Sequence, residues 1–225
     1  MSNAFFDIPI PINEPVKEFR DGSIEKKELL NTIQEMKKNQ VDIPMIINGK
    51  EVKTSKKIEI RAPHNHKLKL GTFNEGDESH VKMAIDAALK AKKEWGSMSW
   101  QSRASIFLKA AELIAGPYRS KINGSTMLGQ SKNVFQAEID AACEFIDFLN
   151  FNAAYMEEIY KNQPESSDGM WNRLDYRPLE GFIFAISPFN FTSIAGNLCA
   201  SPALMGNTVV WKPAYPQIYS ANIIM

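Results

Sequence analysis

The chain has 225 residues, of which 44% are hydrophobic, enough for one large domain or two small ones with a buried core. Its 26 basic and 26 acidic side chains are interspersed, which argues against binding to nucleic acid or to an anionic membrane surface. No apolar stretch approaches the length of a bilayer span, and the first residues resemble neither a signal peptide nor an Arg-rich transit peptide. The two cysteines lie in unrelated contexts and favour a reducing compartment, the cytoplasm or, in a eukaryote, the mitochondrial matrix.

The first part of the chain is predicted to be an arm followed by a helix and short strands. Residues 1–23 are rich in proline and charge, and residues 24–40 carry apolar side chains at helical spacing. The stretch IPMIINGKEVKT places Asn-Gly between β-prone runs, which predicts a hairpin. The stretches KKIEIRAP and KLKLGTF are typical of further short strands.

Three helices are predicted next. In the first, Asp77 is typical of an N-cap and Gly96 of a C-terminal stop. The second begins at Ser99, and the third extends from about Val134 to Asn162. The side chains predicted to face inward are Val81, Ala84, Ala88, Ala91 and Trp95 in the first helix, Ile106, Phe107, Ala110, Leu113 and Ile114 in the second, and Ile139, Ala142, Phe145, Ile146, Leu149, Tyr155, Met156 and Ile159 in the third.

The last part of the chain is predicted to contain a parallel βαβ unit. Residues 163–179 are polar and flanked by Pro and Gly, and predict a hairpin or flap. A strand over 181–186, a helix over about 192–205 and a strand over 208–211 follow. Two parallel strands rarely form a sheet alone, so we expect the sheet to be incomplete here and the chain to be the N-terminal part of something longer.

The strand ends carry the candidate chemical groups. Ligands of open α/β sheets bind beyond the carboxyl ends of the strands, where Asn190 follows the first strand. Its amide could donate to a developing oxyanion, with Pro188 stiffening the turn and Phe189 and Phe191 as apolar walls. The alternative, which the residue types alone favour, is that Asn190 caps the next helix and the Phe residues belong to the core. Lys212 ends the second strand, where it could bind nucleotide phosphate or ribose, or simply extend into water.

Other candidate groups are weaker. No GxGxxG follows the first strand, so the ordinary dinucleotide fingerprint is missing. Cys143 and Cys199 have no neighbouring base and are interpreted as structural thiols. Glu144 belongs to a solvated face or, if it lines a cleft, could receive a substrate ammonium group. His64 and His66 lie in a predicted turn without a third ligand, so no metal site is predicted.

One long stretch, LEGFIFAISPFNFTSIAGNLCASPALMGNTVVWKPA, resembles the aldehyde dehydrogenase superfamily and, within it, the Δ1-pyrroline-5-carboxylate dehydrogenases. RASIFLKAAELIAGP, QAEIDAACEFIDFLNFNAAY and NEPVKEF extend the resemblance over nearly the whole chain. It implies an α/β fold that is the N-terminal part of an aldehyde dehydrogenase: a Rossmann-like NAD-binding domain with a helical N-terminal region and a β-flap, without the catalytic domain.

The resemblance also divides the chain. It implies an N-terminal arm over residues 1–23 and the helical and hairpin part of the NAD-binding domain over 24–162. Residues 163–179 would be a segment of an oligomerisation β-flap, and 180–225 the first βαβ unit of the NAD-binding sheet.

Residue roles follow from the same resemblance. Asn190 looks like the oxyanion-hole amide, Phe191 like an aromatic wall of the aldehyde pocket, and Glu144 like the carboxylate near the substrate amino group. Lys212 matches the lysine that binds the adenosine ribose, but Tyr215 stands where many relatives have an acidic residue, which leaves NADP beside NAD as the cofactor. The stretch that would contact the nicotinamide half of NAD is Ile186, Ser187, Pro188 and Phe189.

The implied activity is the NAD-dependent oxidation of L-glutamate γ-semialdehyde to L-glutamate in proline degradation, by a protein expected to be a homo-oligomer. The cysteine and glutamate motifs that this reaction needs do not occur in these residues, so we expect the chain alone to be inactive. Two alternatives remain: a non-catalytic nucleotide-binding or oligomerisation module derived from an aldehyde dehydrogenase, and a dehydrogenase for a different semialdehyde.

Overall fold

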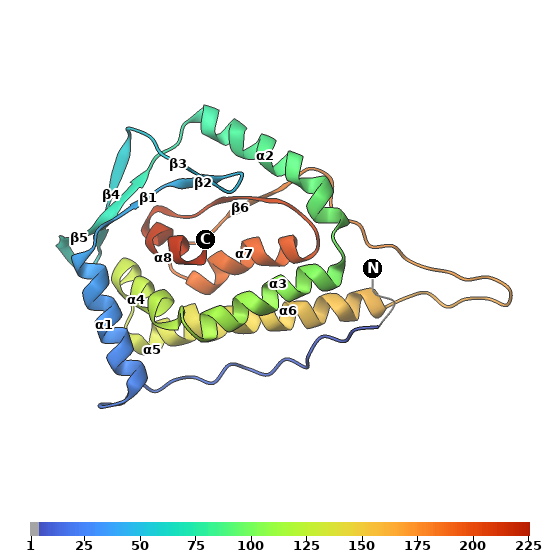
Figure 1. Cartoon of the computed structure of the whole chain (residues 1–225), viewed down its shortest axis with the longest axis horizontal. Helices are drawn as coiled ribbons and strands as arrows, with labels where there is room; N and C mark the ends of the chain where they lie inside the picture. The colour runs from blue at the N-terminus through green and yellow to red at the C-terminus, as the bar shows by residue number, and fades with distance from the viewer. Residues whose placement is uncertain (1–4) are drawn as a thin grey trace.

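Helices and short strands alternate along residues 5–225, the part of the chain that the computed structural model describes (Figure 1). Residues 1–4 of the predicted arm lie outside this range. The elements are α1 (Ile24–Lys38), β1 (Val41–Ile43), β2 (Met45–Ile47), β3 (Lys50–Val52), β4 (Lys57–Ala62), β5 (Asn65–Asn74), α2 (Glu78–Ser97), α3 (Trp100–Ala115), α4 (Arg119–Gln130), α5 (Val134–Ala137), the π-helix η1 (Glu138–Cys143), α6 (Glu144–Lys161), β6 (Ile183–Ile186), α7 (Thr192–Leu204), β7 (Val209–Lys212), the 3-10 helix η2 (Tyr215–Gln217) and α8 (Ile218–Ile224).

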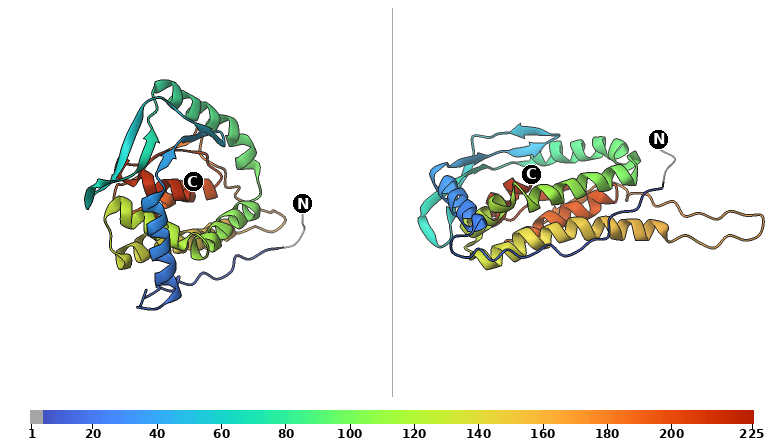
Figure 2. Two further views of the ribbon diagram at one scale, coloured as in Figure 1. Left: turned by 60° about the vertical axis from the view of Figure 1, so that its left-hand side comes forward. Right: turned by 60° about the horizontal axis from the view of Figure 1, so that its bottom comes forward.

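A layer of helices supports the rest of the molecule. The helix α6 packs against both α3 and α7, which also contact each other, while α4 packs against α1 and α8 (Figures 1 and 2). The buried apolar side chains at its centre, such as Ile122, Phe145 and Ile146, join α4 to the long helix. None of the helices over residues 5–225 is long and apolar enough to cross a membrane.

The long helix predicted from Val134 is present and ends at Lys161, close to the predicted Asn162. Asn133 caps its start, because its side chain accepts from the Gln136 N–H and Gln136 bonds back to the Asn133 N–H. Its second segment, η1, is a π-helix, a widening that often occurs at functional sites. In η1 the carboxylates of Glu138 and Asp140 are both buried, which the helical pattern did not predict.

The arm lies along this long helix and is held by carboxylates (Figure 1). Three backbone N–H groups of the arm each donate to one acidic side chain. The pairs are Ile8 with Glu157 at 3.0 Å, Glu14 with Asp147 at 2.7 Å and Lys17 with Glu138 at 2.8 Å. Arg119 completes the contact, since it donates to Glu138 at 2.5 Å, to the Pro15 carbonyl at 2.9 Å and to Glu14. An extended segment with no strand partner thereby has part of its backbone satisfied.

The strands confirm the predicted hairpin and add a small mixed sheet. The β2–β3 turn has positive φ angles at Asn48 (53°) and Gly49 (69°), as a type I′ turn requires. The sheet has the order β1-β5-β4, with β1 parallel to β5. At Gly71 a Cβ atom would lie 2.2 Å from the Val41 carbonyl oxygen, so the close approach of these two strands requires glycine.

The predicted helix starts at Asp77 and Ser99 are confirmed by their side-chain caps, but several other expectations were wrong. The helix α2 continues through Gly96 and ends at Ser97, and α4 was not predicted at all, because its sequence is rich in Gly, Ser and Asn. Several side chains predicted to face inward are exposed instead. They are Val81, Ala91, Ile106, Leu113, Ile139, Tyr155 and Ile159.

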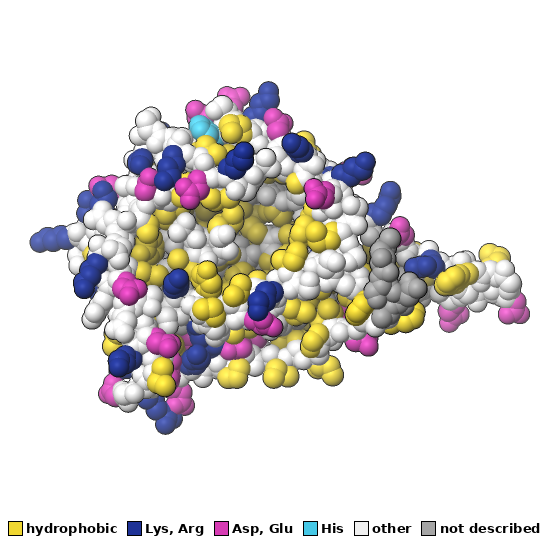
Figure 3. Space-filling model, in the orientation of Figure 1, with side chains coloured by type: hydrophobic (Ala, Val, Ile, Leu, Met, Phe, Trp, Pro, Cys, Tyr) yellow, Lys and Arg dark blue, Asp and Glu magenta, His cyan; other side chains and the backbone are white. Residues whose placement is uncertain are grey.

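The exposure on α2 has a structural cause. Of its residues only Ala88 is buried, and Val81 is 56% exposed, because α2 makes few contacts with its neighbours, chiefly short stretches of β2 and β7 and, near its end, Ala203 of α7. Figure 3 shows apolar side chains lining a hollow beneath this helix. An amphipathic stripe is buried only where another element covers it.

Residues 163–179 fold back on themselves and project from the molecule (Figure 1). The structure describes all of them and places no strand there. Side chains join the two legs instead: the Leu174 N–H donates to the Gln163 side chain at 2.8 Å, and the Tyr176 hydroxyl donates to the Asn162 carbonyl at 2.9 Å. Trp171, near the tip, is 83% exposed. The predicted hairpin shape is present without a backbone ladder.

The predicted βαβ unit is confirmed. The strands β6 and β7 are parallel, with Ile183 opposite Val209 and Ile186 opposite Lys212, and α7 connects them. Within the described residues this sheet has only these two strands. Ala185 of β6 is buried, whereas Phe184 and Ile186, which alternate with it, are 58% and 62% exposed.

Candidate active site

The carboxyl ends of β6 and β7 lie side by side and form the base of the candidate site. Because Ile186 pairs with Lys212, the segments that follow both strands leave the same edge of the sheet. Ser187, directly after β6, is buried between them: the Trp211 indole donates to its hydroxyl at 3.0 Å, and that hydroxyl donates to the Gln217 side chain at 3.0 Å. This buried Ser187 anchors the start of the turn that leads to α7.

Asn190 does not cap the helix that follows it. The helix α7 begins at Thr192 with Phe191 in the N-cap position and no side-chain cap. The Asn190 side chain is partly buried and forms no hydrogen bond to any other residue of the 5–225 range. Phe189 and Phe191 are both exposed, so the alternative that places them in the core is also wrong. The turn therefore presents an amide whose donors are not used within the described chain.

Lys132, between α4 and α5, contacts this turn and stabilises it. Its ammonium group donates to the Asn190 carbonyl and lies 4.4 Å from the centroid of the Phe191 ring. It also forms an ion pair with Asp140 of η1 at 2.5 Å, and both side chains are largely buried. Charge pairing, a hydrogen bond and a cation–π contact thus converge on one lysine.

Asp140 and Glu144, on η1 and the first turn of α6, meet the first turn of α7. Asp140 accepts from the Thr192 N–H at 3.4 Å and from the Ser193 hydroxyl at 3.1 Å. The same hydroxyl lies 2.6 Å from Glu144 Oε2, within donating distance. Glu144 is partly buried and therefore does not belong to a fully solvated face.

A second set of polar side chains also contacts this turn. The Gln217 amide donates to the Phe191 carbonyl at 2.6 Å. The hydroxyl of Thr192 is fully buried, 2.8 Å from the Thr126 hydroxyl, and accepts from Gln130 at 2.7 Å. The carbonyls of Asn190 and Phe191 are therefore both fixed by side chains that are far away in the sequence.

Lys212 ends β7 and is exposed, with its ammonium group 5.2 Å from the centroid of the Tyr215 ring. The Tyr215 hydroxyl donates to Glu75 at 3.1 Å, and Glu75 also pairs with Lys56. The hydrogen bond to Glu75 raises the pKa of Tyr215 above its ordinary value. A carboxylate thus reaches this edge of the sheet from the segment after β5, although Tyr215 stands at the position of the acidic residue expected there.

Similarity to known proteins identifies the family of this chain. A family model described as "Aldehyde dehydrogenase family" matches residues 51–225. The chain belongs to the aldehyde dehydrogenase family. It is 50% identical to Delta-1-pyrroline-5-carboxylate dehydrogenase from Agaricus bisporus over 98% of its own length and 41% of that protein. It is 48% identical to the mitochondrial human protein of that name, over 90% of the chain and 36% of that protein.

Solved structures agree with this assignment. The Δ-pyrroline-5-carboxylate dehydrogenase from Mycobacterium tuberculosis, solved with bound NAD, matches with a TM-score of 0.98 and 46% identity. That match covers 100% of this chain and 42% of the other. This aldehyde dehydrogenase chain thus spans about two fifths of the length of the relatives it matches and corresponds to their N-terminal portion.

Neither cysteine of this aldehyde dehydrogenase chain is poised as a nucleophile. Burial raises the pKa of Cys143 to about 12, with a further contribution from the Glu138 carboxylate. Burial alone raises the pKa of Cys199 to about 12. A thiol must lose its proton to attack, so both side chains are inert near neutral pH.

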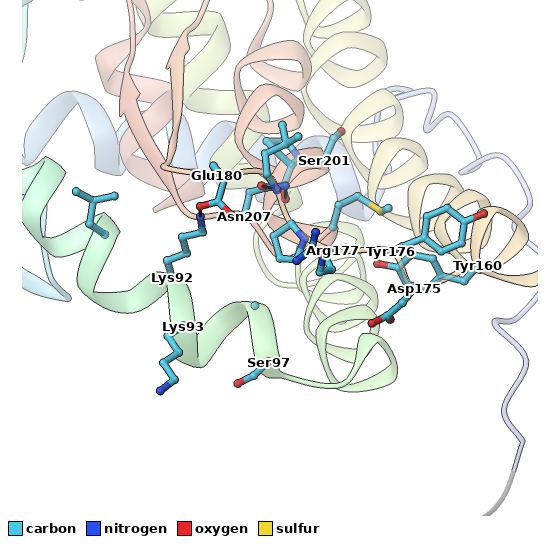
Figure 4. A pocket seen from close by; sticks show the side chains of 16 residues that line it. Lys92, Lys93, Ser97, Tyr160, Asp175, Tyr176, Arg177, Glu180, Ser201 and Asn207 are labelled. Atoms are coloured by element: carbon cyan, nitrogen blue, oxygen red, sulfur yellow. Dashed lines mark hydrogen bonds and ion pairs between the residues drawn. The ribbon is translucent and has the colours of Figure 1, made fainter. Parts of the chain in front are cut away.

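A wide groove of about 1290 Å³ lies elsewhere. It borders Glu180 and Asn207, which precede β6 and β7, and is thus at the amino ends of these strands. Figure 4 shows Lys92 reaching Glu180 across it, and the two are 3.1 Å apart. Because open α/β sheets bind ligands at their carboxyl ends, we place the candidate site at the opposite end, around Asn190.

The structure brings Asn190, Phe191 and Glu144 together around the first turn of α7, and it places Lys212 on the neighbouring strand end. Lys132 and Ser193 were not predicted. Their positions in the sequence carry no motif, and Lys132 reaches its Asn190 partner across 58 residues. The π-helix at Asp140, a feature often found at functional sites, is the structural signal that marks this region.

Proposed function

We propose that this chain supplies the oxyanion donor, part of the aldehyde pocket and half of the cofactor site for the NAD-dependent oxidation of L-glutamate γ-semialdehyde to L-glutamate. The observation that carries the proposal is the amide of Asn190, free of partners in residues 5–225, beside Phe191 and directly before the first turn of α7, where Ser193 contacts Glu144. The relatives named as Δ1-pyrroline-5-carboxylate dehydrogenases support the choice of substrate.

Each residue has a role that its chemistry allows. The Asn190 amide would donate to the aldehyde oxygen as negative charge develops on it, and the fixed turn keeps that donor oriented beforehand. Phe191 would form an apolar wall beside the substrate. Glu144 would accept a hydrogen bond from the substrate ammonium group, which a simple aliphatic aldehyde lacks.

The residues at the strand ends fit NAD. Ile186 and Phe189 offer exposed apolar surface, and Lys212 offers an exposed cation at the neighbouring strand end. When bound, NAD supplies the hydride acceptor. Ser187 and Pro188 belong to the same contact stretch. Tyr215, which presents a hydroxyl bound to Glu75 rather than a carboxylate of its own, keeps NADP as the second candidate cofactor.

The oligomer and the compartment are parts of the same proposal. Residues 163–179 expose Met170, Trp171 and Leu174 on a projecting segment, which supports a role as an oligomerisation flap in a homo-oligomer. The relatives from Dictyostelium discoideum and human are named as mitochondrial enzymes. We place the protein in the mitochondrial matrix if its source is a eukaryote and in the cytoplasm otherwise.

The 225 residues alone are expected to form no NADH from glutamate semialdehyde, because both of their thiols are held protonated. The same observation favours the second candidate function, a non-catalytic nucleotide-binding or oligomerisation module. The two functions can be distinguished in a longer protein, one that carries these residues together with the segments that complete the length of the relatives. If the enzyme function is correct, that longer protein oxidises the aldehyde. If the module function is correct, it does not.

The test of the oxyanion role is the change Asn190→Ala in that longer protein. We expect kcat to fall by about 10²–10³-fold, the usual effect of removing one oxyanion donor, measured as NADH absorbance. The matched control is Asn31→Ala, which removes an exposed amide on α1 and should leave kcat unchanged. Equal kcat values for Asn190→Ala and the unmodified protein would rule out the role.

A further inference from the structure

Lys132 and Asp140 form a buried ion pair that no role assigned so far uses. The side chains of Lys132 and Asp140 are 16% and 6% exposed, and the pair lies directly beneath the turn that carries Asn190. Burying two charges is unfavourable unless good geometry and further hydrogen bonds offset the loss of water. Here both partners make additional contacts, and all of these contacts go to residues 190–193.

We propose that Lys132 and Asp140 are a positioning pair that sets the orientation of the Asn190 amide and leaves Glu144 as the carboxylate that selects the substrate. This inference rests on the proposed function, since it assigns how its two key side chains are held. Neither Lys132 nor Asp140 is proposed to touch the aldehyde.

The backbone of the turn is held at two consecutive carbonyl groups. Lys132 donates to the Asn190 carbonyl, and Gln217 donates to the Phe191 carbonyl at 2.6 Å. Two consecutive peptide groups are therefore fixed, and the Asn190 side chain extends from a backbone that cannot easily rotate. The helix α7 has no side-chain cap of its own, and Asp140 takes over that task from η1 by accepting from the Thr192 N–H.

The two carboxylates next to Ser193 differ in how their charge is compensated. Ser193 has one hydroxyl proton and lies within hydrogen-bonding distance of two carboxylates, Asp140 at 3.1 Å and Glu144 at 2.6 Å. Lys132 neutralises Asp140, whereas Glu144 has no ion-pair partner among residues 5–225. An incoming ammonium group therefore meets one uncompensated carboxylate rather than two. Without Lys132, Asp140 would compete with Glu144 for both the Ser193 proton and the substrate cation.

The test uses the longer protein with four variants. Lys132→Met removes the pair's cation, Lys132→Arg keeps it, and Lys132→Met with Asp140→Asn removes both charges, so that no unpaired buried charge prevents folding. Lys121→Met is the matched control, because Lys121 lies 4.9 Å from the Tyr118 ring centroid but forms no carboxylate pair in the described structure.

We expect Lys132→Met and the double variant to lower kcat by about 10²-fold for both glutamate semialdehyde and propanal, the effect of misplacing a catalytic group. The KM for NAD should stay within about twofold, and Lys132→Arg should recover most of kcat, as expected if a cation at this position orients the turn. If the pair had a merely structural role, the variants would change protein yield or stability but would not lower kcat while the KM for NAD stays the same. A folded double variant with kcat within about twofold of the unmodified protein would overturn the proposal.

A second measurement separates this inference from the proposed function. In the 225-residue chain, hydrogen exchange at the Thr192 amide should be at least about tenfold faster in Lys132→Met than in Lys121→Met, because the cap from Asp140 loses its anchor. If the longer protein oxidises no glutamate semialdehyde while exchange still accelerates, the function is wrong and the positioning role remains. Unchanged exchange would contradict the positioning role whatever the enzyme does.

Discussion

The helical layer and the open side beneath α2 use similar apolar patterns with opposite results. In the helical layer, most apolar side chains of α4 and of the first three turns of α6 are buried, and even the charged groups Arg119 and Glu138 are enclosed and paired. On the open side, Val81 of α2 and Phe184 of β6 are more exposed than buried. The difference teaches that burial is set by the elements available to cover a face, and from it we expect the helical layer to carry most of the chain's own stability.

The largest expected effect is in the helical layer. Arg119→Met should lower the free energy of unfolding by about 3–5 kcal/mol, because it leaves the fully buried Glu138 carboxylate without its cation. Denaturant unfolding of the 225-residue chain measures this. The control is Lys109→Met, which removes an exposed pair with Glu112 and should cost about 0–1 kcal/mol. Equal losses of unfolding free energy for Arg119→Met and Lys109→Met would show that the buried pairing in the helical layer does not contribute the expected stability.

A substitution at the boundary between the helical layer and the open side should lower the free energy of unfolding by less than Arg119→Met does. A Cβ atom on Gly196 of α7 would lie 2.3 Å from the ring of Phe145, which is buried on α6. Gly196→Ala should therefore cost about 1–3 kcal/mol by overpacking, measured in the same way. Gly124→Ala is the control, since its nearest neighbour is the flexible Met36 side chain at 3.3 Å. A neutral Gly196→Ala would mean that α7 is free to shift on α6.

Acid should weaken the helical layer through Glu138. Burial opposes ionisation of Glu138, but hydrogen bonds from Arg119, the Lys17 N–H and Asn123 outweigh it and lower the pKa of Glu138 below its ordinary value of 4.5. A carboxyl whose pKa is lower in the folded state contributes stability that is present above the ordinary pKa and is lost as the pH falls through the folded pKa. Glu138→Gln should therefore flatten the loss of stability below about pH 4.5, followed by circular dichroism. An unchanged pH profile would contradict this assignment.

The smallest effect is expected on the open side. Val81→Ser should change the free energy of unfolding by no more than about 0.5 kcal/mol, because the side chain is already exposed. Ile122→Val, which removes one methyl group from the helical layer, should cost about 0.5–1.5 kcal/mol although it is the milder change. A larger cost for Val81→Ser would show that the face beneath α2 is covered in solution.

Local chemistry made part of this fold predictable. Asp77 and Ser99 begin helices because their side chains accept from N–H groups within the next three residues, and Asn48-Gly49 forms the hairpin because both residues tolerate positive φ. The βαβ unit was predictable for the same reason, since a buried strand, a turn and a helix are each specified by neighbours in the sequence.

Features that depend on distant partners were not predictable. Val81 is exposed because few elements cover α2, and residues 163–179 form no strand although their hairpin shape was predicted. The site divides in the same way. Asn190 could be placed at a strand end from the sequence, whereas its support from Lys132 depends on a tertiary contact across 58 residues.

The central claim is that the first turn of α7 brings the Asn190 amide and the Glu144 carboxylate into one site for an aldehyde that carries an amino group. The most direct test is steady-state kinetics of Glu144→Gln in the longer protein, with L-glutamate γ-semialdehyde and propanal compared. We expect a rise in KM for glutamate semialdehyde that is clearly larger than the rise for propanal, because only glutamate semialdehyde has an ammonium group that loses its hydrogen-bond acceptor. Equal changes for the two aldehydes would contradict it.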